Sequence, residues 1–265
     1  MNCYRFISFL LFAFLAAGCS YKSHEIVVCG DDKVLIIDKT ESDSTDVRVN
    51  WQWKVSDLTD LPDEYQKYMV PTDECKPVDY NSKILITSSG GGVVLIDRQT
   101  KKPMFHAHVP NAHSAELLPG KRIVVALSTA DKGNSIQLFN MTENDEVVFK
   151  DSLYSAHGVV WIDKTRRLFA LGYYELRSYS LKDWDKENPR LKPEKKWKLP
   201  DSSGHELSKV NDNTLLLSTH HSVWLFNTRN GKFTPFGLLE GVENVKSANY
   251  NDKTGELIFT KGEIS

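Results

Sequence analysis

Short apolar segments alternate with polar turns along most of the chain. The stretch from Ala112 to Asn140 shows the unit clearly: a Pro119-Gly120 turn, an apolar run from Ile123 to Leu127, a polar loop and a second apolar run. These runs are too short for helices and rich in β-branched and aromatic residues, so we expect strands. The pattern occurs six times along the chain, this unit included: Ile26–Val28 with Val34–Ile37, Ile84–Ile86 with Val93–Ile96, Ile123–Val125 with Ile136–Phe139, Leu168–Leu171 with Arg177–Tyr179, Leu215–Leu217 with Val223–Phe226, and Leu257–Phe259 without a partner.

Further short strands complete most of these units. Each pair after the first follows another strand that ends in a turn, and each complete pair precedes a fourth apolar segment. Four antiparallel strands repeated radially are typical of a β-propeller, whose blades each need neighbours to bury both faces. We therefore predict an all-β β-propeller of six four-stranded blades, with seven blades as the alternative. The first unit lacks an innermost strand and the chain stops within the sixth, so we expect a C-terminus truncated within the last blade.

Two segments break this rhythm. Residues 61–69 place a proline ahead of acidic residues, which predicts a short helix between the first two units. Residues 182–195 are charged and contain two prolines, which predicts an extended surface loop in the fourth unit.

The N-terminus has the pattern of a targeting segment. A single charge, Arg5, precedes an apolar run, and Ala16-Ala17-Gly18-Cys19 resembles a bacterial lipobox, in which the cysteine is lipidated after cleavage. An ordinary secretory signal is the alternative. We expect a signal peptide over 1–18, a lipidated tether over 19–25 with the lipid on Cys19, and a single propeller domain over 26–265. The predicted location is the envelope of a Gram-negative bacterium, facing the periplasm rather than the cell surface.

The net charge and the cysteine content bear on the class of partner and on whether a disulfide bridge forms. Residues 1–18 contain one of the 33 basic residues and none of the 35 acidic ones, so their removal takes the net charge from −2 to −3. This balance does not favour nucleic acid as a partner. Cys29 and Cys75 would lie in an oxidising compartment that permits a bridge, although cysteines within strands are more often buried thiols. The expected partners are the membrane, through the lipid, and a saccharide or protein ligand.

A polar position recurs in the predicted innermost strands. The second residue of each aligned segment is a cation or a histidine: Lys76, His113, His157, His205 and Lys246. Related by rotation, these side chains would form a ring at one mouth of the central channel, suited to an anion or a metal. Histidines near their ordinary pKa would strengthen the attraction for an anion at mildly acidic pH. His113, His157 and His205 are the candidate metal ligands.

Loops between the second and third strands should surround the same mouth. They bring further aromatic and polar side chains: Asp31, Asp32, Ser89, Asn134, Tyr173, Tyr174, Glu175, His220 and His221. Such a surface suits a saccharide, and a peptide almost as well. By contrast, Ser88–Gly92 lacks the helix and the Lys-Ser/Thr pair of a phosphate loop, and His106 and His108 alternate in an outer strand with no site implied.

Several strings resemble known propeller families. His113, Asp131 and Phe139-Asn140 resemble a WD repeat, which would make His113 a structural residue bonded to the loop aspartate. Weaker similarity extends to quinoprotein-like repeats, without their cofactor chemistry. The whole mature chain resembles an uncharacterised family of bacterial β-propeller lipoproteins, on the strings Asn111–Pro119, Ala156–Val159, Gly204–Leu207 and Gly255–Gly262. That resemblance implies a fold but no activity.

Two functions remain open at this stage. The first is a lipid-anchored, non-catalytic binding or scaffolding protein that presents its channel mouth to a saccharide or a protein. The alternative is a metal-assisted lyase or hydrolase acting on acidic saccharides. The sequence contains none of the order-specific catalytic motifs, so it identifies no catalytic residue and requires no cofactor, although a divalent metal is compatible with the histidines.

Overall fold

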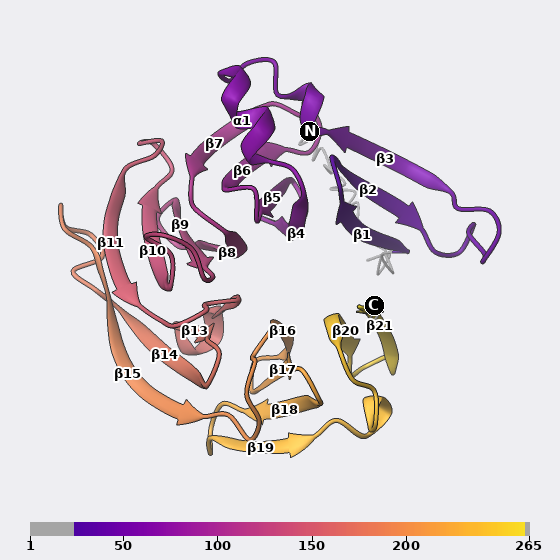
Figure 1. Ribbon diagram of the computed structural model, residues 1–265, viewed down its shortest axis with the longest axis vertical. Coiled ribbons are helices and arrows are strands. Elements are labelled where there is room, and N and C mark those ends of the chain that lie inside the picture. The colour runs from indigo at the N-terminus through magenta and orange to yellow at the C-terminus, as the bar shows by residue number, and fades with distance from the viewer. Residues whose placement is uncertain (1–23, 263–265) are drawn as a thin grey trace, which may run out of the picture.

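The computed structural model describes residues 24–262, whose strands form six antiparallel sheets arranged in a ring (Figure 1). Four sheets have four strands: β4 (Thr72–Val78) to β7 (Pro103–His108), β8 (Ala112–Leu118) to β11 (Val147–Ser152), β12 (Gly158–Ile162) to β15 (Arg190–Lys198), and β16 (Glu206–Asn211) to β19 (Lys232–Pro235). The sheet before them has three strands, β1 (Glu25–Gly30), β2 (Lys33–Asp38) and β3 (Val49–Lys54). The sheet after them has two, β20 (Val245–Asn251) and β21 (Glu256–Lys261). The all-β propeller prediction is confirmed.

The predicted number of blades is wrong. The described residues form five blades, one of three strands and four of four, because the sixth copy of the pattern contributes only the hairpin β20–β21. β1 packs against β4 in the way that β5 packs against β8. The strands β1–β3 therefore correspond to the second, third and fourth strands of a complete blade, as the missing innermost strand in the sequence indicated.

The remaining strands of the complete blades are the second and third of each sheet. They are β5 (Lys83–Ser88) and β6 (Gly92–Asp97), β9 (Arg122–Leu127) and β10 (Ser135–Asn140), β13 (Arg167–Leu171) and β14 (Glu175–Lys182), and β17 (Thr214–Ser218) and β18 (Val223–Asn227). β5, β6, β9 and β10 are buried at nearly every position, because neighbouring blades cover both faces. The outermost strands β11, β15 and β19 are mostly exposed. This difference explains why the second and third strands read as continuous apolar runs.

Hydrophobic clusters hold the blades together. Each of the five clusters of buried side chains lies between two successive sheets; the one between the second and third blades joins Leu85 and Phe105 to Val125 and Phe139. Burying one such side chain contributes about 1.5–3 kcal/mol. Between the first blade and β20–β21, Lys39 Nζ lies 2.5 Å from Glu256 Oε1. Figure 1 shows these two sheets as neighbours in the ring, with the described ends of the chain between them.

Of the predictions for the two irregular segments, one is confirmed and the other is wrong in extent. The predicted helix is present as α1 (Asp63–Tyr68), which follows the short 3-10 turn η1 (Val55–Asp57); η2 (Asp163–Thr165) and η3 (Gly237–Leu239) are the others. The predicted loop over 182–195 is wrong in extent, since β15 begins at Arg190. Pro193 fits in β15 because this strand forms the outer edge of its sheet, where a missing donor is tolerated, and the register shifts beside it.

Candidate functional site

The register of the innermost strands decides which residues share a level of the channel. In each complete blade and in β20–β21, the fifth residue of the second strand pairs with a residue of the innermost strand. In each sheet, the residue that stands immediately before this partner in the innermost strand occupies an equivalent place. We call these five residues the mouth ring: Asp73, His113, His157, His205 and Lys246. Four of the five predicted ring residues are thus brought together.

Lys76 is not part of the mouth ring. It pairs with Leu85 as Glu116 pairs with Val124, which places it three residues further along its strand than Asp73. The sequence pattern of a cation or a histidine in each innermost strand pointed to Lys76 in β4, and Asp73 does not fit that pattern. A register shift between Thr72 and Glu74 also changes the spacing at the start of β4. The ring contains one acidic and one basic residue rather than five cationic or histidine side chains.

The three histidines contact one another in a row along one side of the mouth ring, with His113 and His157 stacked and His205 tilted against His157 at 48°. The ring centroids of His113 and His157 lie 4.4 Å apart at 28°, and those of His157 and His205 lie 5.1 Å apart. Lys246 Nζ is 3.3 Å from His205 Nε2. His157 Nδ1 lies 2.9 Å from the carbonyl oxygen of Ser155, to which it donates in the tautomer that satisfies this contact. His205 Nδ1 is buried without a hydrogen-bond partner.

Burial lowers the pKa of each of these histidines. Burial, with a further contribution from the charge of Lys246, lowers the pKa of His113. Burial and the neighbouring His113 lower the pKa of His157 to about 4, and burial and His157 lower that of His205 to about 3. The expectation that these rings attract anions more strongly at mildly acidic pH is therefore wrong for His157 and His205, which stay uncharged there. Each neutral imidazole offers one donor and one acceptor.

The mouth ring does not have the arrangement of a metal site. Within residues 24–262, no group of three or more His, Cys, Asp or Glu side chains is placed to hold a metal ion. The WD-type contact is not made either, since the described His113 ring forms no hydrogen bond with Asp131, which is exposed. The histidine with structural hydrogen bonds is His157.

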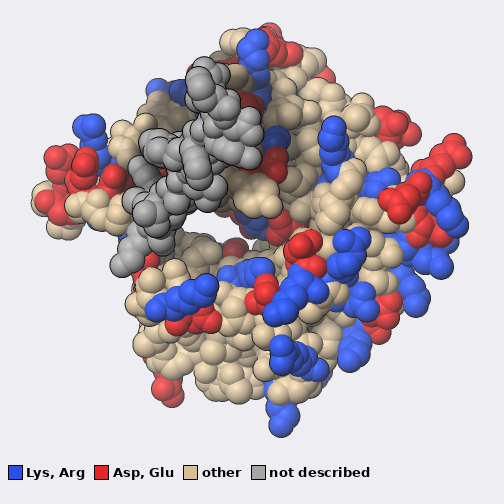
Figure 2. Space-filling model, turned by 180° about the vertical axis from the view of Figure 1, so that it is seen from behind, with Lys and Arg blue, Asp and Glu red and all other residues tan. Residues whose placement is uncertain are grey.

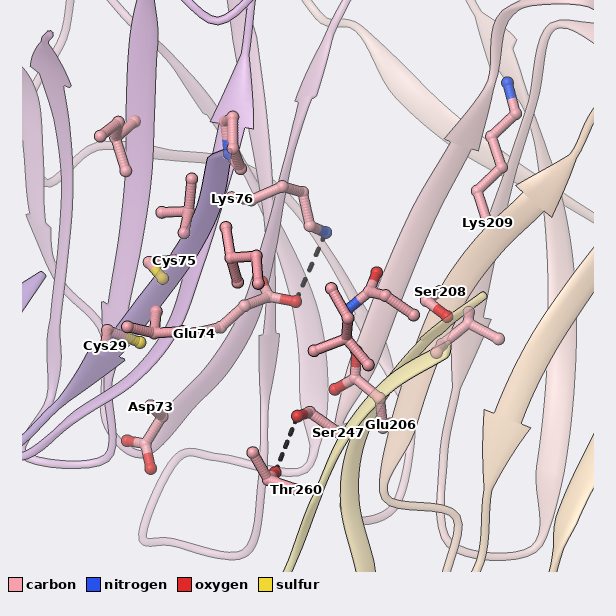
Figure 3. Close-up of a pocket in the computed structure, with 18 of the residues that line it drawn as sticks. Cys29, Asp73, Glu74, Cys75, Lys76, Glu206, Ser208, Lys209, Ser247 and Thr260 are labelled. Atoms are coloured by element: carbon pink, nitrogen blue, oxygen red, sulfur yellow. Dashed lines mark hydrogen bonds and ion pairs between the residues drawn. The ribbon is translucent and has the colours of Figure 1, made fainter. Parts of the chain in front are cut away.

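Below the mouth ring, a lysine is surrounded by carboxyl groups. Lys76 Nζ lies 3.5 Å from Glu74 Oε1 and 3.5 Å from Glu116 Oε2, and it donates to the carbonyl oxygens of Ala115 (2.9 Å) and Val159 (3.0 Å). Figure 3 shows Lys76 and Glu74 pointing toward each other, with Glu206 across the cavity. One ammonium group therefore contacts the innermost strands of three blades.

The pKa values in this lower level are shifted by burial and mutual interaction. Burial alone would lower the pKa of Lys76, but Glu116 and Glu74 more than offset it, so that the pKa is raised. Burial raises the pKa of Glu116 despite the opposing charge of Lys76. Burial, and then the charge of Glu74, raise the pKa of Glu206 well above its ordinary value. A protonated Glu206 both donates and accepts hydrogen bonds.

Both levels line one cavity of about 1010 Å³. Its wall also includes β1 from Glu25 to Cys29, and Ile258 and Thr260 from β21. Figure 2 shows an opening at the centre of the molecule with acidic and basic side chains around it. The volume is at the upper end of the range for small-molecule sites.

Cys29 and Cys75 meet in the wall of this cavity. Both are free, half-buried thiols in adjacent blades (Figure 3). A hydrogen bond to Cys29, together with burial, raises the pKa of Cys75. The structure thus shows buried thiols, the alternative to a bridge.

The other predicted site residues lie elsewhere. Tyr174 and Glu175 line a separate hollow of about 340 Å³, with Tyr173 packed against Tyr174. His220 and His221 contact each other, and His221 Nδ1 lies 3.7 Å from Glu243 Oε1. Neither histidine lines the channel cavity. Cys19 and the predicted signal peptide lie outside the described residues.

Sequence reasoning missed the acidic side chains of the channel, namely Asp73, Glu74, Glu116 and Glu206. A signal for them was present. Glu116 follows Ala115 within a strand that ends in two leucines, and Glu206 stands between His205 and Leu207. A charged residue within a strand that neighbours cover on both faces can point only into the channel.

One family model matches residues 26–235, which run from β1 to the end of β19, and its description is "Family of unknown function (DUF6528)". The chain belongs to this family. The match covers all five blades of this DUF6528 protein and stops before β20. No curated protein matches the sequence. In the described part of the chain, no helix is long and apolar enough to cross a bilayer.

Proposed function

We propose that this protein is a lipid-anchored propeller of the cell envelope that binds a saccharide, without catalysis, in the mouth of its channel. The observation that carries the proposal is the set of neutral polar groups around the cavity. Burial lowers the pKa values of His113, His157 and His205, and it raises that of Glu206 well above its ordinary value, so the neutral form of each group is favoured. In its neutral form each of these groups has a donor and an acceptor, as a sugar hydroxyl does, although the donor of His157 is engaged by the carbonyl oxygen of Ser155 and leaves only its acceptor for a ligand.

The charges at the mouth support a ligand that is at most weakly anionic. Lys246 forms no salt bridge with a described carboxylate, while Asp73 lies in the same ring. Within the mouth ring, a phosphate or a sulfate would meet one cation, Lys246, beside the carboxylate of Asp73. A hydroxyl-rich ring, with or without one carboxylate for Lys246, matches the groups present. The membrane anchor through Cys19 is part of the proposal on the strength of the sequence alone.

A titration series tests this function. Oligosaccharides of galacturonic acid and their methyl-esterified, neutral counterparts are titrated calorimetrically into the parent, Lys246→Met and His205→Gln. We expect binding to the parent, weaker binding of both sugars by His205→Gln, and a loss for Lys246→Met confined to the acidic sugars. Lys253→Met, which changes an exposed lysine in the turn after β20, is the control.

Two outcomes would contradict the proposal. Saccharide binding that is unchanged in both channel variants removes the channel mouth as the site. Absence of binding to any member of a broad glycan array, with retention of an envelope protein by the parent but not by His205→Gln, replaces the saccharide with a protein partner. Lipidation is tested separately by metabolic labelling with a fatty-acid analogue, which Cys19→Ala should abolish.

A further inference from the structure

The hollow that contains Tyr174 and Glu175 lies away from the channel, at the junction of the third and fourth blades. It is lined by Asn134, Ser152 and Tyr154 from the third blade and its exit, and by Tyr174, Glu175 and Arg177 from β14 and the turn before it. Its volume of about 340 Å³ is at the lower end of small-molecule sites. The hollow is therefore large enough for a small ring-shaped group.

Aromatic faces are available to a ligand there. The rings of Tyr154 and Tyr174 are nearly parallel, at 14°, with centroids 6.1 Å apart, and each side chain is 55% exposed. Tyr173 packs edge-on against Tyr174 at 4.5 Å. Because these rings touch one another, they form a continuous aromatic shelf rather than a cage around a cation. We call Tyr154, Tyr173 and Tyr174 the tyrosine shelf.

The tyrosine shelf is held in place by its backbone. Tyr173 N donates to the carbonyl oxygen of Tyr154 at 3.0 Å, and Leu199 N donates to that of Tyr174 at 2.9 Å. Asn134 Oδ1 accepts from Ser155 N at 2.9 Å. These bonds fix the backbone that carries the rings, and a tyrosine side chain has only two χ angles to order on binding, which keeps the entropy cost low and favours affinity.

The polar groups beside the tyrosine shelf are balanced in charge. Arg177 Nε donates to Glu175 Oε1 at 2.7 Å, and Arg177 Nη1 lies 3.2 Å from Asp151 Oδ2. Lys196 forms an ion pair with the second oxygen of Glu175. These partners lower the pKa of Glu175, against the opposing effect of burial, so its carboxyl remains ionised. With two cations and two anions in contact, the hollow has no excess charge to recruit an ion.

We infer that the tyrosine shelf is a second binding site, for a neutral pyranose ring of a saccharide chain. The apolar face of a pyranose stacks on exposed aromatic rings, while its hydroxyls reach hydrogen-bonding groups at the edge. Tyr154 and Tyr174 supply the faces, and the Asn134 amide and the fixed Glu175 and Arg177 side chains supply the edge. The site is independent of the channel mouth, so it does not require the proposed function to be correct.

The test uses the full chain on an array of neutral glycans, followed by calorimetric titration of the best-bound oligosaccharide. The double variant Tyr154→Ala/Tyr174→Ala should bind that oligosaccharide at least about tenfold more weakly, from the loss of two stacking faces. Tyr174→Phe keeps the face and should stay within about threefold of the parent. Tyr80→Ala is the matched control, because Tyr80 is fully exposed in the turn between β4 and β5, at the opposite end of the strands.

The outcomes separate this site from the channel. If the channel variants Lys246→Met and His205→Gln lose binding while the tyrosine-shelf variants do not, the inference is wrong and the proposed function stands. If only the tyrosine-shelf variants lose binding, the inference stands and the proposed function of the channel mouth is wrong. An equal loss in Tyr174→Phe and Tyr174→Ala overturns stacking. Binding of tetramethylammonium in place of every neutral sugar identifies a cation site and overturns the inference. Thermal melts of each variant exclude unfolding as the cause.

Discussion

Individual side chains of the mouth ring differ in how firmly the protein holds them. His157 Nδ1 lies 2.9 Å from the Ser155 carbonyl oxygen and 3.2 Å from Ser155 Oγ, whereas His205 Nδ1 has no partner. Replacing His157 by Ala leaves a half-buried acceptor unsatisfied, which typically costs about 1–3 kcal/mol. Replacing His205 by Ala removes no such bond. We expect the thermal midpoint to fall clearly further in His157→Ala than in His205→Ala; equal midpoints would mean that His157 does not support the fold.

The neutral state of His205 predicts a pH dependence of stability. Its pKa in the folded protein is about 3, below the value of about 6.5 in an unfolded chain. Between these values only the unfolded chain binds the proton, so stability is complete above pH 6.5 and falls as the pH decreases. The difference in unfolding free energy between the parent and His205→Gln should fall by at most about 1.4 kcal/mol per pH unit below pH 6.5.

The difference in unfolding free energy between the parent and His205→Gln reports on the proton of His205. The neighbouring His113, His157, Lys246 and Asp73 are common to both proteins, and so are the carboxyl groups of the lower level, whose raised pKa values act in the opposite direction. Urea titrations at several pH values provide the measurement. A difference that is constant with pH would mean that His205 binds its proton equally well in the folded and the unfolded protein.

At the scale of strands and blades, a close approach of two innermost strands depends on a glycine. A Cβ atom added to Gly158 at the start of β12 would lie 2.5 Å from Leu207 Cβ in β16. Gly158→Ala must therefore push the fourth and fifth blades apart, at a cost of about 1–3 kcal/mol. Gly237→Ala is the control, since nothing lies within 4 Å of its added Cβ. Chemical denaturation of the two variants compares them, and equal stability would show that the blades can separate freely.

The strands were predictable because their burial is regular. β5, β6, β9 and β10 are covered on both faces, so their apolar runs stand out and their positions match the sequence pattern. The outer strand β15 was only partly predicted, because an exposed edge strand tolerates charges and a proline. The ring position of Asp73 was missed because the register shift in β4 cannot be read from spacing. The location of Tyr174 depends on blade packing, which strand patterns do not encode.

At the scale of the whole molecule, Lys76 contacts three blades at the axis of the ring. Lys76→Met would leave Glu74 and Glu116 without their partner, and loss of one member of a buried charged pair costs about 3–5 kcal/mol. The carboxyl groups would then take up protons more readily in the folded protein. Thus we expect a large fall in thermal midpoint at neutral pH that becomes smaller at pH 5.

The comparison variant is Lys209→Met, which removes an exposed ion pair with Asp212 and should change the unfolding free energy by no more than about 1 kcal/mol. Melts of both variants at pH 5 and pH 7 check the prediction. If Lys76→Met is as stable as Lys209→Met at neutral pH, the three-blade contact contributes nothing to the fold.

Because of Lys76, the positive charge at the centre of the ring does not depend on cations in the surrounding solution. A dissolved cation held by the same two carbonyl oxygens and two carboxylates would stabilise the fold only as far as its concentration exceeded its dissociation constant. The ammonium group of Lys76 is attached by its own side chain and cannot be diluted or chelated. The cation at the axis is thus supplied when the chain is synthesised, and it is present in fresh water as in a medium rich in salt.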